Sequence, residues 1–179
     1  TTSANPGLYL NTHPNNTVAE SFIGDNVSGL YVWGAQLNSG TSPMTYIPTT
    51  NAAVNNLRIE SNGALIEGQR TNLALQSEDM GTTWAKGGDI VLSLDNTTSP
   101  SGDNSADRVY DPEGQSLSQT ITVSASTAYT FSWYVKSVGA IGLLNYAIYD
   151  GSNSAYIVGA TDYGSLVNST SWSRISVTF

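Results

Sequence analysis

The chain has 179 residues, enough for one domain with a substantial core. Its 6 Lys and Arg against 14 Asp and Glu give a net charge of -8, which argues against nucleic acid and anionic membranes as partners. The sequence has no Cys, which excludes disulfides and thiol chemistry, and no apolar run near the roughly 20 residues that span a bilayer.

Short apolar runs, separated by clusters of Gly, Asn, Ser and Pro, recur along the whole chain and predict β-strands. The first predicted strand covers residues 7–11. The next covers residues 30–37, and its alternating pattern assigns one face to the core. That face carries Tyr31, Trp33, Ala35 and Leu37.

The stretch that follows is less regular. Residues 38–51 contain two prolines and many hydroxyl groups, so we expect an extended edge or linker there. Residues 52–57 predict a short helical turn. Short apolar pieces then predict further strands at residues 65–66, 73–75, 90–94 and 108–110.

The clearest alternation lies in residues 119–136, which predict two strands joined around residues 124–126. Their core-facing side chains are Ile121, Val123, Tyr129, Phe131, Trp133 and Val135. Residues 144–160 predict a hairpin, because the Gly, Ser and Asn residues of its turn tolerate positive φ angles. The last predicted strand, residues 172–179, places Ile175, Val177 and Phe179 on one side.

The number and spacing of these strands predict an all-β fold, specifically an antiparallel jelly-roll β-sandwich. The last predicted strand shows no turn signal before Phe179. A strand edge there exposes backbone N–H and C=O groups unless a neighbouring strand pairs with them. We therefore expect strand contacts with neighbouring modules or with further copies of the chain.

Five stretches of the sequence carry a resemblance to a known family. They are residues 65–84 (LIEGQRTNLALQSEDMGTTW), 98–109 (TSPSGDNSADRV), 117–136 (LSQTITVSASTAYTFSWYVK), 172–179 (WSRISVTF) and 29–50 (GLYVWGAQLNSGTSPMTYIPTT). Together they resemble a β-sandwich module common in phage tail and tail-fibre proteins, which is similar to carbohydrate-binding modules of the family four and nine type. The resemblance implies a virion appendage or another extracellular location.

The order of these stretches is rotated relative to the module, because the closing residues 29–50 come before the opening residues 65–84. In a domain description, residues 1–50 are closing strands, residues 51–64 are a connector and residues 65–179 are opening and central strands. One domain results if all these strands belong to one sandwich. Two half-domains result if the strands are shared between chains.

Three arrangements account for the rotation. In the first, the chain is circularly permuted, with residues 172–179 and 7–11 as neighbouring strands of one fold. In the second, the closing strands complete the sandwich of a neighbouring chain, which gives head-to-tail contacts that close a ring or extend a fibre. In the third, the sequence is an excerpt from a tandem array.

A sugar-binding surface needs aromatic rings, which stack on sugar rings, and polar groups, which bind the hydroxyls. Outward positions of the predicted strands offer Tyr134, Lys136, Asn145, Tyr149, Trp172 and Arg174. We expect Trp172 and Tyr149 to form a stacking platform, whereas Trp33 and Trp133 are predicted core residues and Trp84 is a predicted packing anchor. The plainer alternative is a set of exposed aromatic residues on the rim of the sandwich.

The resemblance also implies a structural calcium ion, because related sandwich modules hold one beside a carboxylate that follows the first strand. The matching residues are Glu78 and Asp79. Calcium needs six to eight oxygen ligands, so further acids must converge on it. The candidates are Asp107, Asp103 and Asp150, and the alternative is that all these acids are solvated surface groups. No other cofactor is expected.

No reaction is indicated by the sequence. His13 is the only histidine, and no G-x-S-x-G motif surrounds any serine, so a catalytic triad is not expected. We therefore expect a non-enzymatic protein with a structural and adhesive role in a tail fibre or similar assembly, combined with weak glycan binding. The alternatives are a free carbohydrate-binding module appended to a polysaccharide-degrading enzyme, and a small polysaccharide lyase or hydrolase.

Overall fold

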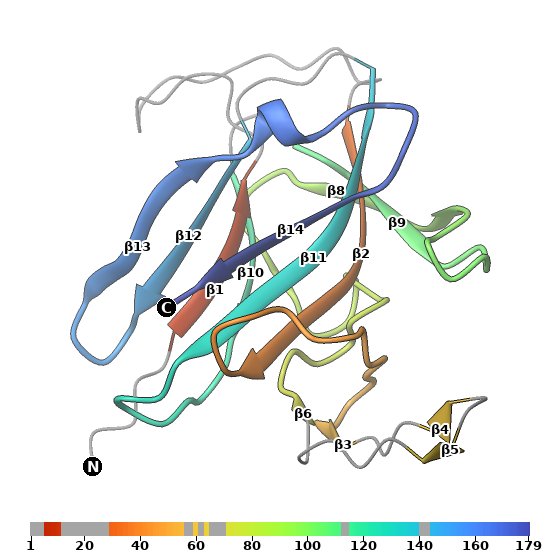
Figure 1. Cartoon of the computed structure of the whole chain (residues 1–179). Coiled ribbons are helices and arrows are strands. Elements are labelled where there is room, and N and C mark those ends of the chain that lie inside the picture. The colour runs from red at the N-terminus through yellow and green to blue at the C-terminus, as the bar shows by residue number, and fades with distance from the viewer. Residues whose placement is uncertain are drawn as a thin grey trace.

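The computed structural model describes residues 6–11, 29–55, 59–60, 63–64, 71–111, 115–139 and 144–179. These residues form two five-stranded antiparallel sheets that pack face to face (Figure 1). The only helical element in the described part is a 3-10 turn, η1 (Gly164–Leu166). The predicted all-β sandwich is therefore confirmed, while its jelly-roll connectivity stays a prediction.

The first sheet, which we call the β1 sheet, has the strand order β13-β12-β1-β10-β7. Its strands are β13 (Ala155–Asp162), β12 (Asn145–Asp150), β1 (Pro6–Asn11), β10 (Ser116–Thr120) and β7 (Ala85–Lys86). Strands β12 and β13 form the hairpin predicted for residues 144–160. The Asp150 carboxylate accepts backbone N–H bonds from Ser152 and Asn153, which stabilises the hairpin turn.

The second sheet, which we call the β2 sheet, has the strand order β14-β11-β2-β9-β8. Its strands are β14 (Ser173–Thr178), β11 (Tyr129–Val138), β2 (Gly29–Ser39), β9 (Ala106–Tyr110) and β8 (Val91–Thr97). Two small ladders join β3 (Val54–Asn55) to β6 (Thr71–Asn72) and β4 (Ile59–Glu60) to β5 (Gly63–Ala64). The helical turn predicted from residue 52 is wrong, because β3 is extended and paired with β6.

The two N-terminal strands occupy the centres of the two sheets. Strand β1 lies between β12 and β10, and β2 lies between β11 and β9. The last strand, β14, lies in the β2 sheet and β1 lies in the β1 sheet, so the two strands that the permuted arrangement predicted as neighbours do not pair with each other. The domain division and any sharing of strands between chains stay predictions, because the structure holds one chain.

The core lies between the two sheets and follows the predicted alternation on most strands. On β11 the side chains of Tyr129, Phe131, Trp133 and Val135 are buried in it. Ile175 of β14 packs there as well, with Val177 and Phe179 half-buried against it. Trp84 is also a core residue, as its predicted role as a packing anchor requires.

Strand β2 departs from simple alternation at Gly34. Leu30 and Val32 face the core before this residue, and Ala35 and Leu37 face it afterwards. Gly34 has a φ of 64°, and the pairing of β2 with β11 shifts register at this point. An inserted residue of this kind reverses the phase of the strand, so Ala35 and Leu37 are correctly predicted core residues.

Tyr31 and Trp33 lie on the other side of this reversal. Both alternate with Leu30 and Val32 along the strand, so their side chains point to the opposite face of the sheet and lie outside the core between the sheets. Trp33 is nevertheless only 3% exposed. The predicted burial of Trp33 is confirmed, but the predicted direction is wrong for both residues, because both point out of the β2 sheet.

The buried side chain of Asn72 joins β6 to the middle of β2. Its Oδ1 accepts hydrogen bonds from the backbone N–H groups of Leu37 (2.9 Å) and Ala74 (3.0 Å). Its Nδ2 donates to the carbonyl oxygens of Ala35 (3.2 Å) and Ile47 (2.9 Å). All four hydrogen-bonding positions of the amide are therefore used in a fully buried place.

The variant Gly34→Ala is expected to lower the free energy of unfolding by about 1 to 3 kcal/mol, because a left-handed conformation strains a residue with a Cβ. The new Cβ would also lie 3.2 Å from the ring of Tyr46 and 3.3 Å from that of Tyr134. Gly159→Ala is the control, since its Cβ meets nothing within 4 Å. Urea unfolding of both variants is the measurement, and equal stability of Gly34→Ala and wild type would contradict the bulge.

The variant Asn72→Ala is expected to lower the free energy of unfolding by about 3 kcal/mol or more, because it leaves two backbone N–H and two C=O groups buried without partners. The matched control is Asn104→Ala, which removes one exposed bond to the Asp95 carbonyl. Chemical denaturation measures both changes. A loss for Asn72→Ala no larger than that for Asn104→Ala would show that the buried amide is dispensable.

Candidate functional site

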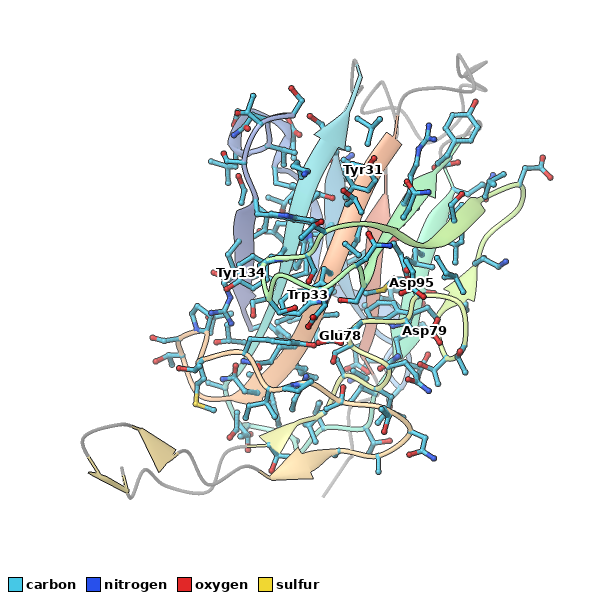
Figure 2. All side chains as sticks on the ribbon, turned by 90° about the vertical axis from the view of Figure 1, so that its right-hand side faces the viewer. Tyr31, Trp33, Glu78, Asp79, Asp95 and Tyr134 are labelled. Atoms are coloured by element: carbon cyan, nitrogen blue, oxygen red, sulfur yellow. The ribbon has the colours of Figure 1, made fainter. Side chains whose placement is uncertain are left out.

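The outer side of the β2 sheet gathers aromatic and basic side chains, and Figure 2 labels three of the aromatic residues, Tyr31, Trp33 and Tyr134. The strand register produces this, because Trp33 pairs with Tyr134 and Tyr134 pairs with Arg174 across β2, β11 and β14. Side chains that pair across neighbouring strands share one face. We call this surface the aromatic face, and its members are Tyr31, Trp33, Tyr46, Tyr134, Lys136, Trp172 and Arg174.

The first cluster on the aromatic face consists of Tyr31, Lys136 and Trp172. The two ring centroids are 6.4 Å apart. The Lys136 ammonium lies 5.3 Å from the centroid of Tyr31 and 5.2 Å from that of Trp172. These distances are those of cation–π contacts, which hold the ammonium at a fixed place beside both rings.

The second cluster surrounds Trp33. Its ring centroid lies 4.3 Å from that of Tyr46 and 5.6 Å from that of Tyr134. The guanidinium carbon of Arg174 lies 5.4 Å from the Tyr134 centroid. Arg174 Nη2 also donates to the Met44 carbonyl oxygen (2.6 Å) and to Ser132 Oγ (3.0 Å), so the guanidinium is held from both sides.

The segment between β8 and β9 is bound to both clusters. Trp172 Nε1 donates to the Thr98 carbonyl oxygen at 3.3 Å, and Trp33 Nε1 donates to Ser105 Oγ at 3.1 Å. Both indole N–H groups are thus used within the protein. A ligand on this face would meet ring surfaces, tyrosine hydroxyls and cations instead.

Residues 44–49 fix the position of Tyr46 over Trp33. Gln36 Oε1 accepts the Ile47 N–H at 2.8 Å, and Gln36 Nε2 donates to the Met44 carbonyl at 3.3 Å. Because Gln36 is fully buried, these bonds hold the segment against β2. The same Met44 carbonyl also accepts the hydrogen bond from Arg174. This one backbone group therefore helps to position both the segment that carries Tyr46 and the guanidinium of Arg174.

The Tyr46 hydroxyl lies at the edge of this cluster, 2.7 Å from Ser77 Oγ, and it donates to Glu78 Oε1 at 3.1 Å. Burial of the phenol, together with the nearby Glu78 charge, raises the pKa of Tyr46 far above its ordinary value. Tyr46 therefore stays protonated. Its hydroxyl keeps the proton that it donates to Glu78 Oε1.

Four of the six sequence-predicted sugar contacts lie together and two do not. Tyr134, Trp172 and Arg174 are on the aromatic face, with Lys136 beside them. Asn145 and Tyr149 belong to β12 in the β1 sheet, on the side opposite to the core residues of that strand. They therefore lie on the other side of the sandwich.

The predicted stacking platform of Trp172 and Tyr149 is consequently wrong. Trp172 is half-buried against Tyr31 and Lys136. Tyr149 packs against Tyr156 of the neighbouring strand, with ring centroids 5.2 Å apart. Asn145 is only 7% exposed, which leaves its amide little access to a ligand.

Sequence reasoning missed three members of the aromatic face. Simple alternation assigns Tyr31 and Trp33 to the core because it takes no account of the reversal at Gly34. A glycine inside a strand is nevertheless a known sign of a bulge. Tyr46 lies in an irregular segment, where no alternation indicates which way a side chain points. Trp33 and Tyr46 supply two of the three rings of the second cluster, and Tyr31 supplies one of the two rings of the first.

The acids proposed for calcium have other roles. Asp107, 1% exposed, accepts the Met80 N–H at 2.7 Å and the Asp95 N–H at 2.9 Å. Asp79 accepts the Gly81 N–H at 2.8 Å, and Glu78 is bonded to Tyr46. No three acids or histidines of the described residues come together as metal ligands do.

The remaining candidates do not join this group. Asp150 belongs to the hairpin turn of the β1 sheet, and Asp103 is exposed in the segment between β8 and β9. The calcium ion thus stays a prediction that the described carboxylates do not support. His13 lies outside the described residues. No helix in the described part of the chain is long and apolar enough to cross a membrane.

The pH dependence of stability should report the environment of Asp107. Burial raises the pKa of Asp107 above its ordinary value of 3.8, and the Asp79 and Asp95 charges add to this, while the two N–H bonds oppose it. A carboxyl with a raised pKa binds its proton more tightly in the folded protein. The resulting stability is complete below the ordinary pKa and is lost as pH rises through the raised one.

We therefore expect the unfolding free energy of wild type, minus that of Asp107→Asn, to fall as pH rises from below 3.8 through the raised pKa. Taking the difference cancels the titration of the other acids. Urea unfolding at a series of pH values provides the measurement. A difference that stays constant or increases over this range would contradict the effect of burial.

Comparisons with known proteins add no assignment. A scan of the chain against protein-family models finds no match, and searches of curated proteins and of solved structures find none either. The chain is therefore described by its own geometry. The feature that any functional proposal must explain is the collection of half-buried rings and cations on the aromatic face.

Proposed function

We propose that this protein is a non-enzymatic, adhesive β-sandwich that binds glycans through the aromatic face, as part of a tail fibre or similar surface assembly. The observation that carries the proposal is the juxtaposition of four half-buried aromatic residues with basic groups on one outer sheet surface. These residues are Tyr31, Tyr46, Tyr134 and Trp172. The resemblance of the sequence to phage tail modules supports the structural context.

Binding would use two kinds of contact. Sugar rings carry apolar CH groups that pack on aromatic rings, and their hydroxyls need hydrogen-bond partners. The hydroxyls of Tyr31 and Tyr134 make no hydrogen bond to another described residue, so both remain available to a ligand. The clusters are already fixed by the β2 sheet and by residues 44–49, so little ordering of side chains is needed on binding.

The adhesive role would depend on repetition. A single shallow contact with a sugar is weak, whereas several copies in one assembly raise the effective concentration of binding sites. A free carbohydrate-binding module would use the same face without an assembly. Light scattering separates the two, because a fibre subunit forms a multimer and an appended module stays a monomer.

We expect Tyr134→Ala to weaken glycan binding about tenfold, because an aromatic contact contributes roughly 1 kcal/mol or more beyond its area. Binding is first detected on a glycan array and then measured by calorimetry. Trp172→Ala should act in the same direction. The matched control is Tyr156→Ala, since Tyr156 is 65% exposed on β13 of the other sheet and should leave affinity unchanged.

Two results would contradict this proposal. One is the absence of binding to every glycan on a broad array. The other is binding that Tyr134→Ala and Trp172→Ala leave intact, because the aromatic face would then not be the site. Circular dichroism of each variant shows whether the fold is retained, which keeps loss of contact separate from loss of structure.

A further inference from the structure

We infer that the glycan bound by the aromatic face is acidic, and that its carboxylate groups are recognised by Lys136 and Arg174. This inference rests on the proposed function and names the class of ligand. It depends on three observations, namely where the basic residues lie, what they contact, and which ring surfaces they cover.

The basic residues that the structure describes lie mostly on this side of the sandwich. Of the four in the described part of the chain, Arg108, Lys136 and Arg174 lie on the outer side of the β2 sheet, and Lys86 lies in β7 of the other sheet. Arg108 shares the face because it pairs with Tyr31. In a chain with a net charge of -8, this is an unusual accumulation of positive charge.

The charges of Lys136 and Arg174 are not neutralised within the described structure. The ammonium of Lys136 contacts only the rings of Tyr31 and Trp172. Arg174 contacts the Tyr134 ring, a backbone carbonyl and a serine hydroxyl. Neither residue forms an ion pair with a described carboxylate, so each can still attract an anion.

Some of the described acids lie at the edges of the aromatic face, and one of them, Glu78, is hydrogen-bonded to its member Tyr46. Asp79 and Asp95 are on the side of β8 and β9, and Glu78 lies below Trp33 (Figure 2). Glu78 and Asp79 are each engaged by hydrogen bonds, to Tyr46 and to Gly81. Lys136 and Arg174 lie on β11 and β14, away from these three acids, so we expect an anionic ligand to approach the face on that side.

The cations also cover ring surfaces that a neutral sugar would need. Lys136 lies over Tyr31 and Trp172, and Arg174 lies over Tyr134. A neutral sugar stacking there would have to displace a cation from a favourable contact. An acidic sugar instead pairs its carboxylate with the cation in place, while its ring packs beside the aromatic side chain.

The spacing of the two cations suits neighbouring groups on one oligosaccharide. Arg174 pairs with Tyr134, and Lys136 follows two residues later on the same strand. Arg174 on β14 and Lys136 on β11 are therefore diagonal neighbours across two paired strands, and such positions are about 7 to 8 Å apart in the backbone. Charge complementarity over two adjacent positions favours a ligand that repeats its carboxylates along a chain.

The test compares a hexamer of galacturonic acid with the same hexamer after methyl esterification, which removes the charge and keeps the sugar. Calorimetry in low-salt buffer should show the acid form binding at least tenfold more tightly. At about 1 M salt, where the Debye length is roughly 3 Å, this preference should largely disappear. Lys136→Gln should weaken binding of the acid form roughly fivefold, as expected for one partly exposed ion pair.

Lys86→Gln is the control variant, because it makes the same change in net charge on an exposed residue of the other sheet, and it should bind like wild type. Arg174→Gln should weaken binding as Lys136→Gln does. Arg174 also donates hydrogen bonds to Met44 and Ser132, so the melting temperature of the Arg174→Gln variant is checked first. Lys136 makes no hydrogen bond to a described residue, but its variant also loses the contacts with the rings of Tyr31 and Trp172, so the melting temperature of Lys136→Gln is checked in the same way.

The outcomes distinguish this inference from the proposed function. If the two hexamers bind equally, the ligand is not recognised by its acidic groups, although it is still a glycan. The same conclusion follows if neither hexamer binds but a neutral glycan does, and Tyr134→Ala weakens that binding. If the acid hexamer binds and neither Lys136→Gln nor Arg174→Gln weakens the binding, these two residues are not the binding site. Equally tight binding of polyglutamate would show attraction of any polyanion, which overturns the inference and removes support for a glycan.

Discussion

The structure depends on the buried amide of Asn72. Three pieces of chain meet at this side chain, namely β6, the centre of β2 and the irregular segment through Ile47. An irregular segment has no strand partner for its backbone groups, so a buried one needs side-chain donors and acceptors. Asn72 supplies them at the point where β2 reverses phase, which makes the bulge and the packing of residues 44–49 one connected arrangement.

Alternation predicted the core wherever a strand is regular. On β11 and β14 the pattern of apolar residues corresponds to the buried faces, because a side-chain period of two leaves no other solution once one face is buried. On β2 one phase of alternation cannot hold on both sides of an inserted residue, so it is correct for Ala35 and Leu37 after Gly34 and wrong for Tyr31 and Trp33 before it. Gly34 was present in the sequence, but its φ of 64° is set by the pairing with β11 and by the rings above it.

The candidate site was predicted in part for a related reason. Alternation separates inward from outward positions on each strand, and it did so for Tyr134, Arg174 and Tyr149. It does not say to which sheet a strand belongs. Because β12 pairs with β1 whereas β11 and β14 pair in the other sheet, two outward sets that look alike in the sequence end on opposite sides of the sandwich.

Buried hydrogen bonds beneath the aromatic face fix the positions of its side chains. Asn72 holds Ile47, Gln36 holds both Ile47 and Met44, and the Met44 carbonyl accepts the bond from Arg174. This chain of buried bonds places Tyr46 on Trp33 and the guanidinium over Tyr134. Rings and cations held in this way lose little conformational entropy on binding, so even a shallow surface can present a defined pattern of charge to a ligand.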